Sequence, residues 1–260
     1  MTWAFKRQVF DLIIFFGVVA VFGFLIIYPF FQKEPTCKDG RQNGTELGVD
    51  CGGSCVLACM ETTDPVSILW SRAFKVVEGR YNAVAYIENH NENQAVSKIR
   101  YRFRFADENN VYIGKRDGET SIPPSGNFAV FEPAIDLGNS IPVYTTFEFT
   151  EAPVWTQVTS DKVNQLKIFV SDVKLEGEDS DPRLSATIKN NSLFTIPDVN
   201  VVAILYDDLG NAVSTSQTYF QKLAGEEVQN VNFTWPEPFS AKVLTKEIIP
   251  VFNVFGAQLK

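Results

Sequence analysis

The chain has 260 residues, of which 45% are hydrophobic and 21% are charged, and its formal net charge is −8. This composition is typical of a folded protein with room for two small domains, and it excludes a disordered chain. It also argues against a nucleic-acid partner, because a phosphate backbone requires a basic surface.

An uncharged apolar segment covers residues 12–31. At about 1.5 Å per residue it matches the roughly 30 Å hydrocarbon core of a bilayer, which predicts a transmembrane helix whose partner is the lipid bilayer. Lys6 and Arg7 precede it, so the positive-inside rule places residues 1–11 in the cytoplasm as a stub and the rest of the chain outside. A cleaved signal peptide is the alternative; the segment is long for one, and no Ala-x-Ala site follows it.

All four cysteines, Cys37, Cys51, Cys55 and Cys59, lie in the next segment, residues 32–64. Outside the cytoplasm, an even number of cysteines in a glycine-rich segment predicts disulfides, and four cysteines allow three pairings. A four-cysteine zinc or iron–sulfur site is the alternative, although such sites usually have two close pairs separated by a spacer.

Oxygen-bearing side chains recur in the same segment at Asp39, Asn43, Glu46 and Asp50. Calcium binds carboxylate and amide oxygens in such glycine-rich loops, so these four residues are candidate ligands of a structural calcium ion. The alternative is that Asp and Asn only build turns, and the lack of EF-hand spacing favours it. No other cofactor is expected.

The segment from Cys37 to Cys55 follows the pattern Cys-x-Asp-Gly-x-x-Asn-Gly-x-Glu-x-Gly-x-Asp-Cys-Gly-Gly-x-Cys. This pattern resembles a short Cys-rich repeat of bacterial cell-surface and secreted proteins, and that resemblance implies a surface location. Loosely, it also resembles the calcium-dependent repeats of Notch-type receptors, from which it differs in cysteine number. The Notch-type resemblance implies calcium binding.

After Pro65 the sequence changes to short alternating runs that predict β-strands. Residues 199–206 are nearly all apolar, as in a central strand covered on both faces. The clearest strand covers residues 99–105, where apolar residues and arginines alternate. One side of that strand is expected to hold Ile99, Tyr101, Phe103 and Phe105, and the other Arg100, Arg102 and Arg104.

The two halves of this region resemble each other at a spacing near 100 residues. Residues 86–89 and 105–110 correspond to residues 187–190 and 206–211. The spacing predicts an all-β fold with two tandem Ig/fibronectin-III-like sandwiches, residues 65–160 and 161–260. The acidic residues at 107–108 and 207–208 are expected to form turns rather than to act as catalytic carboxylates.

The second half resembles the FxLYD-type domain. The matching residues are Ile188-Lys-Asn-Asn-Ser, the strand leading to Leu205-Tyr206-Asp207, Gly210 and the Leu223-Ala-Gly-Glu turn. That family is common in envelope-anchored bacterial proteins, so the resemblance implies a sandwich fold and an envelope location, and it carries over no catalytic residue. The first half differs, because Phe105-Ala106-Asp107 stands where the family has Leu-Tyr-Asp.

The sequence offers no convergent catalytic set, and we expect the chain not to be an enzyme. Its one histidine, His90, lies in a polar loop and is expected to be a solvated turn residue. The row Arg100, Arg102 and Arg104 is a candidate patch for an anionic polymer. The alternative is a solvated strand face paired with cross-strand acidic residues.

These observations predict a membrane-anchored extracytoplasmic protein that acts as a binding or adhesion module of the cell envelope. Its expected partner is an envelope glycan or another membrane or surface protein. The alternative is a non-catalytic structural or assembly subunit of a membrane protein complex. Asp11 favours this alternative slightly, because a charge near the membrane core often meets a partner.

Overall fold

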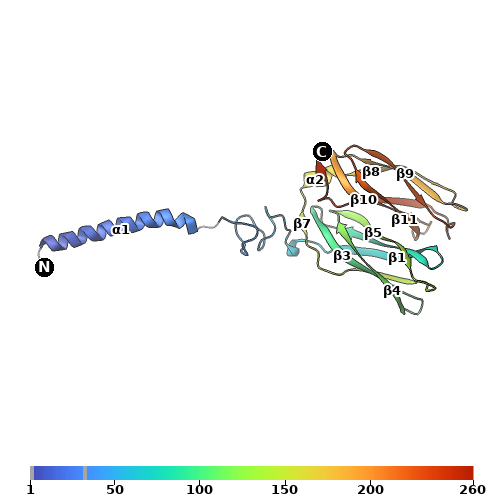
Figure 1. Ribbon diagram of the computed structural model, residues 1–260, viewed down its shortest axis with the longest axis horizontal. Coiled ribbons are helices and arrows are strands. Elements are labelled where there is room, and N and C mark those ends of the chain that lie inside the picture. Colours follow the sequence, from blue (N-terminus) through green and yellow to red (C-terminus); the bar gives the residue numbers. More distant parts are fainter. Residues whose placement is uncertain (1–2, 32–33, 260) are drawn as a thin grey trace. The chain divides into compact units, whose positions relative to one another are not determined.

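The computed structural model describes residues 3–31 and 34–259 (Figure 1). Residues 32 and 33, which begin the expected Cys-rich segment, lie outside the described residues, as do residues 1, 2 and 260 of the expected stub and second sandwich. The chain divides into two compact units, residues 1–54 and 55–260.

The first unit begins with a single long helix, α1 (Trp3–Phe31). Its stretch from Arg7 to Tyr28 is long and apolar enough to cross a membrane, and none of this stretch is buried in the protein. Apolar side chains are exposed all around the helix, which suits lipid rather than a protein core. Both a membrane anchor and a signal sequence have this character. The expected helix over residues 12–31 lies within α1.

The rest of the first unit, residues 34–54, consists of turns without a regular strand or helix among the described residues. Glycine is required at position 53, where φ is +59° and a Cβ atom would overlap the backbone carbonyl of Thr45. None of the four cysteines is free, so the expected disulfides are confirmed. Cys37 and Cys51 belong to the first unit, and Cys55 and Cys59 to the second.

The second unit is built almost entirely from antiparallel β-strands, so the all-β, sandwich-like fold is confirmed. Its first half contains β1 (Ser67–Val77), β2 (Arg80–Asn89), β3 (Gln94–Ala106), β4 (Tyr112–Ile122), β5 (Gly126–Asp136), β6 (Tyr144–Phe149) and β7 (Thr156–Gln157). Its second half contains β8 (Ile168–Glu176), β9 (Arg183–Asn190), β10 (Phe194–Tyr206), β11 (Ala212–Leu223), β12 (Val228–Thr234), β13 (Thr245–Val251) and β14 (Gln258–Leu259).

The strands form four sheets, two from each half of the unit. The first half gives β4-β3-β6, extended by β7 on β3, and β1-β2-β5. The second half gives β11-β10-β13, extended by β14 on β10, and β12-β9-β8. Figure 1 shows these sheets stacked, from the β3–β4 pair through β5 and then β10–β11 to the β8–β9 pair.

Three apolar cores fill the spaces between the four sheets. One lies inside the first sandwich, around Phe103 and Phe128, and another inside the second, around Ile188 and Phe233. The third joins the two sandwiches, since its residues come from β1, β2 and β5 on one side and from β10, β11 and β13 on the other. The two sandwiches therefore form one four-layered body.

The middle strands β2 and β10 are buried on both faces, which makes this stacking possible. On β2, Ala85 and Ile87 point into the first sandwich, while Val84 points toward the second. On β10, residues 201, 203 and 205 face the inside of the second sandwich, while residues 202 and 204 face the shared core. The expectation of a central strand at residues 199–206 is thus confirmed.

The alternating strand at residues 99–105 is confirmed as part of β3. Its four apolar side chains are at most 5% exposed, and they pack inside the first sandwich. Arg100 and Arg104 are exposed on the opposite face, and Arg102 is partly exposed.

A short helix, α2 (Ser160–Gln165), lies at the expected boundary between the two halves. This helix has no buried residue, so the sequence has no apolar residues at helical spacing that would predict it. Its start depends on Thr159, whose hydroxyl oxygen caps the helix by accepting a hydrogen bond from the backbone of Lys162 at 3.3 Å.

Each half contains a buried asparagine at the end of its second strand. Asn89 is 1% exposed and Asn190 is 0% exposed. Each side-chain oxygen accepts the backbone N–H two residues further along the chain, at 3.0 Å. Each side-chain nitrogen donates to carbonyls of two neighbouring turns: Gln94 and Pro123 for Asn89, and Phe194 and Ala224 for Asn190. The internal repeat therefore extends to individual hydrogen bonds.

The acidic turns repeat in the same way. The side chain of Asp107 accepts hydrogen bonds from the backbones of residues 109 and 111, and that of Asp207 from residues 209 and 211. These bonds hold the pKa of Asp207 below its ordinary value, the one to the Asn211 backbone contributing most. Both aspartates therefore act as turn formers, as the sequence predicts.

Replacing Asn190 by Ala should destabilise the body strongly, because several buried backbone groups would lose their partner. Each unsatisfied buried group costs about 1–3 kcal/mol, so we expect the free energy of unfolding to fall by about 3 kcal/mol in urea denaturation. The neighbouring Asn191 is exposed, and Asn191→Ala is the matched control. Equal midpoints for the two variants would contradict a structural role for Asn190.

A carboxylate shared by two tyrosines links the two sandwiches. The hydroxyl of Tyr86, from β2, donates to Glu247 Oε1 at 2.7 Å, and that of Tyr206, from β10, donates to Glu247 Oε2 at 2.8 Å. Trp70 stacks on Tyr86 with ring centroids 5.5 Å apart. Burial, followed by the Glu247 hydrogen bond, raises the pKa of Tyr86 to about 12.

This pKa predicts a loss of stability at alkaline pH. An unfolded tyrosine ionises near pH 10, whereas folded Tyr86 keeps its proton to about pH 12. The stability that protonated Tyr86 gives the folded state is therefore complete below about pH 10 and is lost as the pH rises through about 12. Tyr86→Phe should make the decline in Tm across this interval shallower. Tyr112→Phe, at an exposed tyrosine, should leave it unchanged; an equal slope in both variants would refute the link.

Candidate functional site

The arginine row lies on the outer face of the β4-β3-β6 sheet, where neighbouring strands carry acidic residues. Arg102 forms a two-pronged ion pair with Asp117 of β4, with Nε–Oδ1 at 2.6 Å and Nη2–Oδ2 at 3.3 Å. Arg104 Nη2 lies 2.7 Å from Glu148 Oε1 of β6. The guanidinium of Arg100 makes no ion pair with any described residue, although its backbone N–H donates to Glu151 at 2.9 Å.

The charges on this face are therefore largely balanced within the sheet. The hydrogen bonds from Arg102 and then Lys115 hold the pKa of Asp117 at about 2, so Asp117 stays ionised at neutral pH. Lys98 pairs in the same way with Glu119 at 2.7 Å. An anionic polymer would have to compete with these carboxylates for two of the three arginines. Its binding to the row stays a prediction.

Hydrogen bonds bring together the four candidate calcium ligands in the loop of residues 34–54. Asp50 accepts the backbone N–H groups of Asp39 and Gly40, each at 2.9 Å. Glu46 accepts those of Asn43 and Asp50, at 3.2 and 3.4 Å. The Asn43 side chain donates to Asp39 at 2.9 Å, and this bond is the main reason that the pKa of Asp39 lies below its ordinary value.

These carboxylates thus bind backbone N–H groups and hold the turns of the loop in place. One oxygen of the set, Asn43 Oδ1, is buried and has no hydrogen-bond partner among the described residues. Carboxylate and amide oxygens suit calcium chemically, but the bonds to N–H groups serve the turn-building role as well. Calcium binding by Asp39, Asn43, Glu46 and Asp50 stays a prediction.

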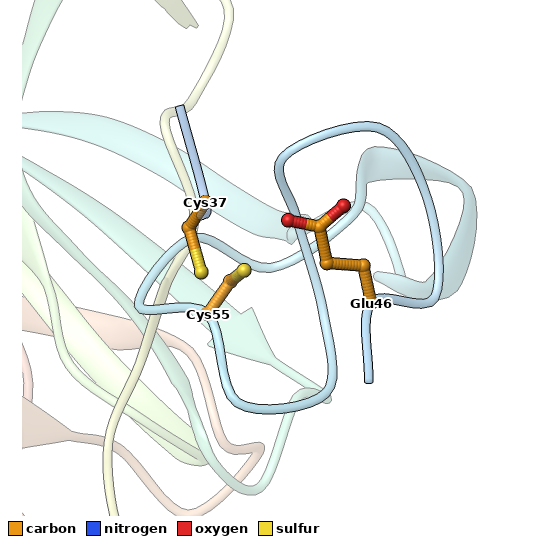
Figure 2. Close-up of side chains that lie close together, drawn as sticks. All are labelled: Cys37, Glu46 and Cys55. Carbon is orange, nitrogen blue, oxygen red and sulfur yellow. The ribbon is translucent and has the colours of Figure 1, made fainter. Parts of the chain in front are cut away.

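Figure 2 shows the side chains of Cys37, Glu46 and Cys55. Both of these cysteines are disulfide-bonded and have no thiolate to offer a metal ion. The carboxylate of Glu46 accepts backbone N–H groups of its own loop. The disulfide-bonded state argues against the four-cysteine zinc or iron–sulfur alternative.

His90 lies in the turn after β2, where its side chain is 45% exposed. Its Nδ1 is 3.7 Å from Glu88 Oε1, and its Nε2 is 3.2 Å from the hydroxyl of Ser67. These are surface contacts of a solvated turn residue.

A polar triad of the first sandwich was not predicted from the sequence; its carboxylate and phenol are buried, and its arginine is exposed. Glu132, from β5, is 7% exposed and accepts a hydrogen bond from the Tyr101 hydroxyl at 2.7 Å and one from Arg116 Nε at 2.9 Å. Burial and then the Glu132 bond raise the pKa of Tyr101 above its ordinary range. Gly118 leaves the space for this approach, since a Cβ there would overlap Tyr101 and Glu132.

The triad connects the two sheets of the first sandwich, because Tyr101 and Arg116 lie on β3 and β4 and Glu132 lies on β5. The pairing of a buried carboxylate with an arginine and a phenol satisfies all three polar groups. Neither sequence spacing nor a motif links residues 101, 116 and 132, so only the strand register could reveal the triad.

Glu132→Ala should lower the free energy of unfolding by about 2 kcal/mol, because it leaves the buried Tyr101 hydroxyl unpaired. The expected result is a lower midpoint in chemical denaturation. The control is Glu119→Ala, which removes a surface ion pair on the neighbouring strand and should change the midpoint little. A midpoint for Glu132→Ala as high as that of the control would show that the triad adds no stability.

No protein-family model and no curated protein matches the chain. Three solved structures with weak similarity are a transglutaminase of red sea bream, beta-glucuronidase 2 of Bacteroides uniformis and a beta-glucuronidase of glycoside hydrolase family 2. Their sequence identities are 10%, 13% and 10%, and their TM-scores are 0.23, 0.21 and 0.22.

The matches cover 72%, 66% and 85% of this chain, which spans 31%, 24% and 29% of those proteins. At these TM-scores the likeness supports no argument about function. The functional interpretation therefore depends on the chain's own residues.

Proposed function

We propose that the chain is a membrane-anchored, extracytoplasmic binding protein of the cell envelope and that it catalyses no reaction. In this proposal residues 1–11 stay in the cytoplasm, and the apolar segment of α1, residues 12–31, crosses the bilayer once. The disulfide-bonded loop and the β-sheet body lie outside. The resemblances to a bacterial Cys-rich surface repeat and to FxLYD-type domains support this location.

The observation that carries the proposal is the combination of an apolar helix with cysteines that are all disulfide-bonded. Disulfides persist in oxidising compartments, which for an anchored chain means the outer side of the membrane. Lys6 and Arg7, which precede the uncharged apolar segment of the helix, support the same orientation.

The four-layered body suits binding better than catalysis. Its polar groups of altered pKa, including Tyr86 and Tyr101, bind other side chains of the protein and serve as structural contacts. The outer face of the β4-β3-β6 sheet presents Arg100 without an ion pair among the described residues, beside the paired Arg102 and Arg104. We propose an acidic envelope glycan as its ligand.

Retention of the full-length protein in nanodiscs by fractions of the source envelope tests this proposal. We expect retention by the glycan fraction, weakened by salt and reduced several-fold by the triple variant Arg100→Gln, Arg102→Gln, Arg104→Gln, because guanidinium–anion attraction is screened by salt. The control removes the same charge from the outer face of the β12-β9-β8 sheet: Lys174→Gln, Arg183→Gln and Lys189→Gln.

An equal loss of glycan retention in both triple variants would show that binding depends only on net charge, and it would contradict a specific arginine site. Retention only by the membrane-protein fraction, unchanged by the three arginine substitutions, would favour the structural or assembly subunit over the glycan-binding protein.

A further inference from the structure

The short strand β7 of the first sandwich is paired on both of its edges. Thr156 pairs with Ala95 of β3 on one side and with Leu57 on the other. The backbone of Gln157 donates to the carbonyl of Val56 at 2.7 Å, and that of Ala58 to the carbonyl of Trp155 at 3.0 Å. The segment 56–58, which precedes the sandwich, therefore covers the outer edge of β7.

The second sandwich has a counterpart of β7 that lacks this cover. Strand β14 pairs with Phe194 and Thr195 at the start of β10, as β7 pairs with Gln94 and Ala95 at the start of β3. Within residues 34–259, no segment pairs with the other edge of β14. An open edge presents unpaired backbone N–H and C=O groups, to which another extended segment can add.

A groove of about 420 Å³ lies beside β14, between α2, the start of β8 and the turn that leads to β10. Large apolar side chains line it and remain exposed: Phe169 by 53%, Leu193 by 65% and Leu259 by 66%. Apolar side chains of this size, gathered at an open strand edge, are typical of a surface that a partner covers.

The groove also has a charge opposite to that of the whole chain. Lys167 is its one charged lining residue among those described, and Lys167 makes no ion pair with a described residue. The other polar lining side chains are Ser192 and the amides of Asn164, Gln165 and Asn191. In a chain of net charge −8, a groove without a carboxylate favours an acidic ligand.

We propose that the open edge of β14 and this groove bind an extended apolar segment of a partner protein that carries an acidic residue. The backbone of the segment adds to β14, its apolar side chains cover Leu193 and Leu259, and its carboxylate pairs with Lys167. The chain's own covering segment has this chemistry, since Val56-Leu57-Ala58 is followed at a short distance by Glu61. This site is independent of the arginine face and does not require the proposed glycan binding.

A peptide that copies residues 54–62, with both cysteines replaced by serine, is the probe. Fluorescence anisotropy with the full-length protein in nanodiscs should give saturable binding. Leu193→Glu should weaken this binding at least about tenfold, because it puts a carboxylate into the groove beside that of the peptide and removes apolar contact area. Leu209→Glu, at a leucine 82% exposed in the β10–β11 turn, should leave it unchanged.

The proposed ion pair has its own test in a double-mutant cycle. Lys167→Gln in the protein and glutamine at position 61 of the peptide should each weaken binding several-fold. The loss of affinity when both changes are combined should be smaller than the product of the two single losses. Losses that multiply fully would overturn the pairing of the peptide carboxylate with Lys167.

Two results would overturn the site itself. The first is the absence of saturable binding up to about 1 mM peptide, or binding that Leu193→Glu leaves unchanged. Unchanged binding would occur if the peptide displaced residues 56–58 at β7 instead. The second is self-association of the chain that Leu193→Glu abolishes, without peptide binding, which would assign the edge to a second copy. The Leu193→Glu variant should still be retained by the glycan fraction, because the substitution lies away from the arginine face. Such retention distinguishes a failure of the β14 site from a failure of the proposed function.

Discussion

The burial of both faces of β2 and β10 is the constraint on which the body depends. A sandwich of two sheets ordinarily leaves its outer faces to water, and its strands alternate between apolar and polar residues. Here each sandwich has one sheet whose second face is apolar as well, with Val84 in the first half and Val202 and Ile204 in the second. Neither face can remain in water without cost, so the two sandwiches join into one unit.

The shared core also determines where polar groups can lie. At its margin, Glu247 accepts hydrogen bonds from Tyr86 and Tyr206, so both phenols are satisfied although partly buried. Inside the first sandwich, Glu132 is satisfied by Tyr101 and Arg116. These contacts give the stacked sheets a defined register that apolar packing alone does not specify.

Much of the fold could be predicted from the sequence because its strongest signals are local. The alternation at residues 99–105, the apolar run at 199–206 and the repeated acidic turns each depend on neighbours along the chain. The partners of the arginine row could not be assigned, since Asp117 and Glu148 lie opposite Arg102 only through the register of β4 and β6. In that register Glu148 forms its ion pair with Arg104 from a diagonal position. The same holds for the Glu132 triad, whose members come from three strands.

The difference between the two ends follows from chain order in a duplicated fold. The segment that precedes the first sandwich, residues 56–58, pairs with β7 and covers its outer edge. The second sandwich is preceded by β7 itself, which already pairs with β3, and then by α2. A single connecting segment cannot complete the sheet behind it and also cover β14. Within residues 34–259, duplication therefore leaves one strand edge of the second sandwich open to an added segment, and the exposed Leu193 and Leu259 lie beside that edge.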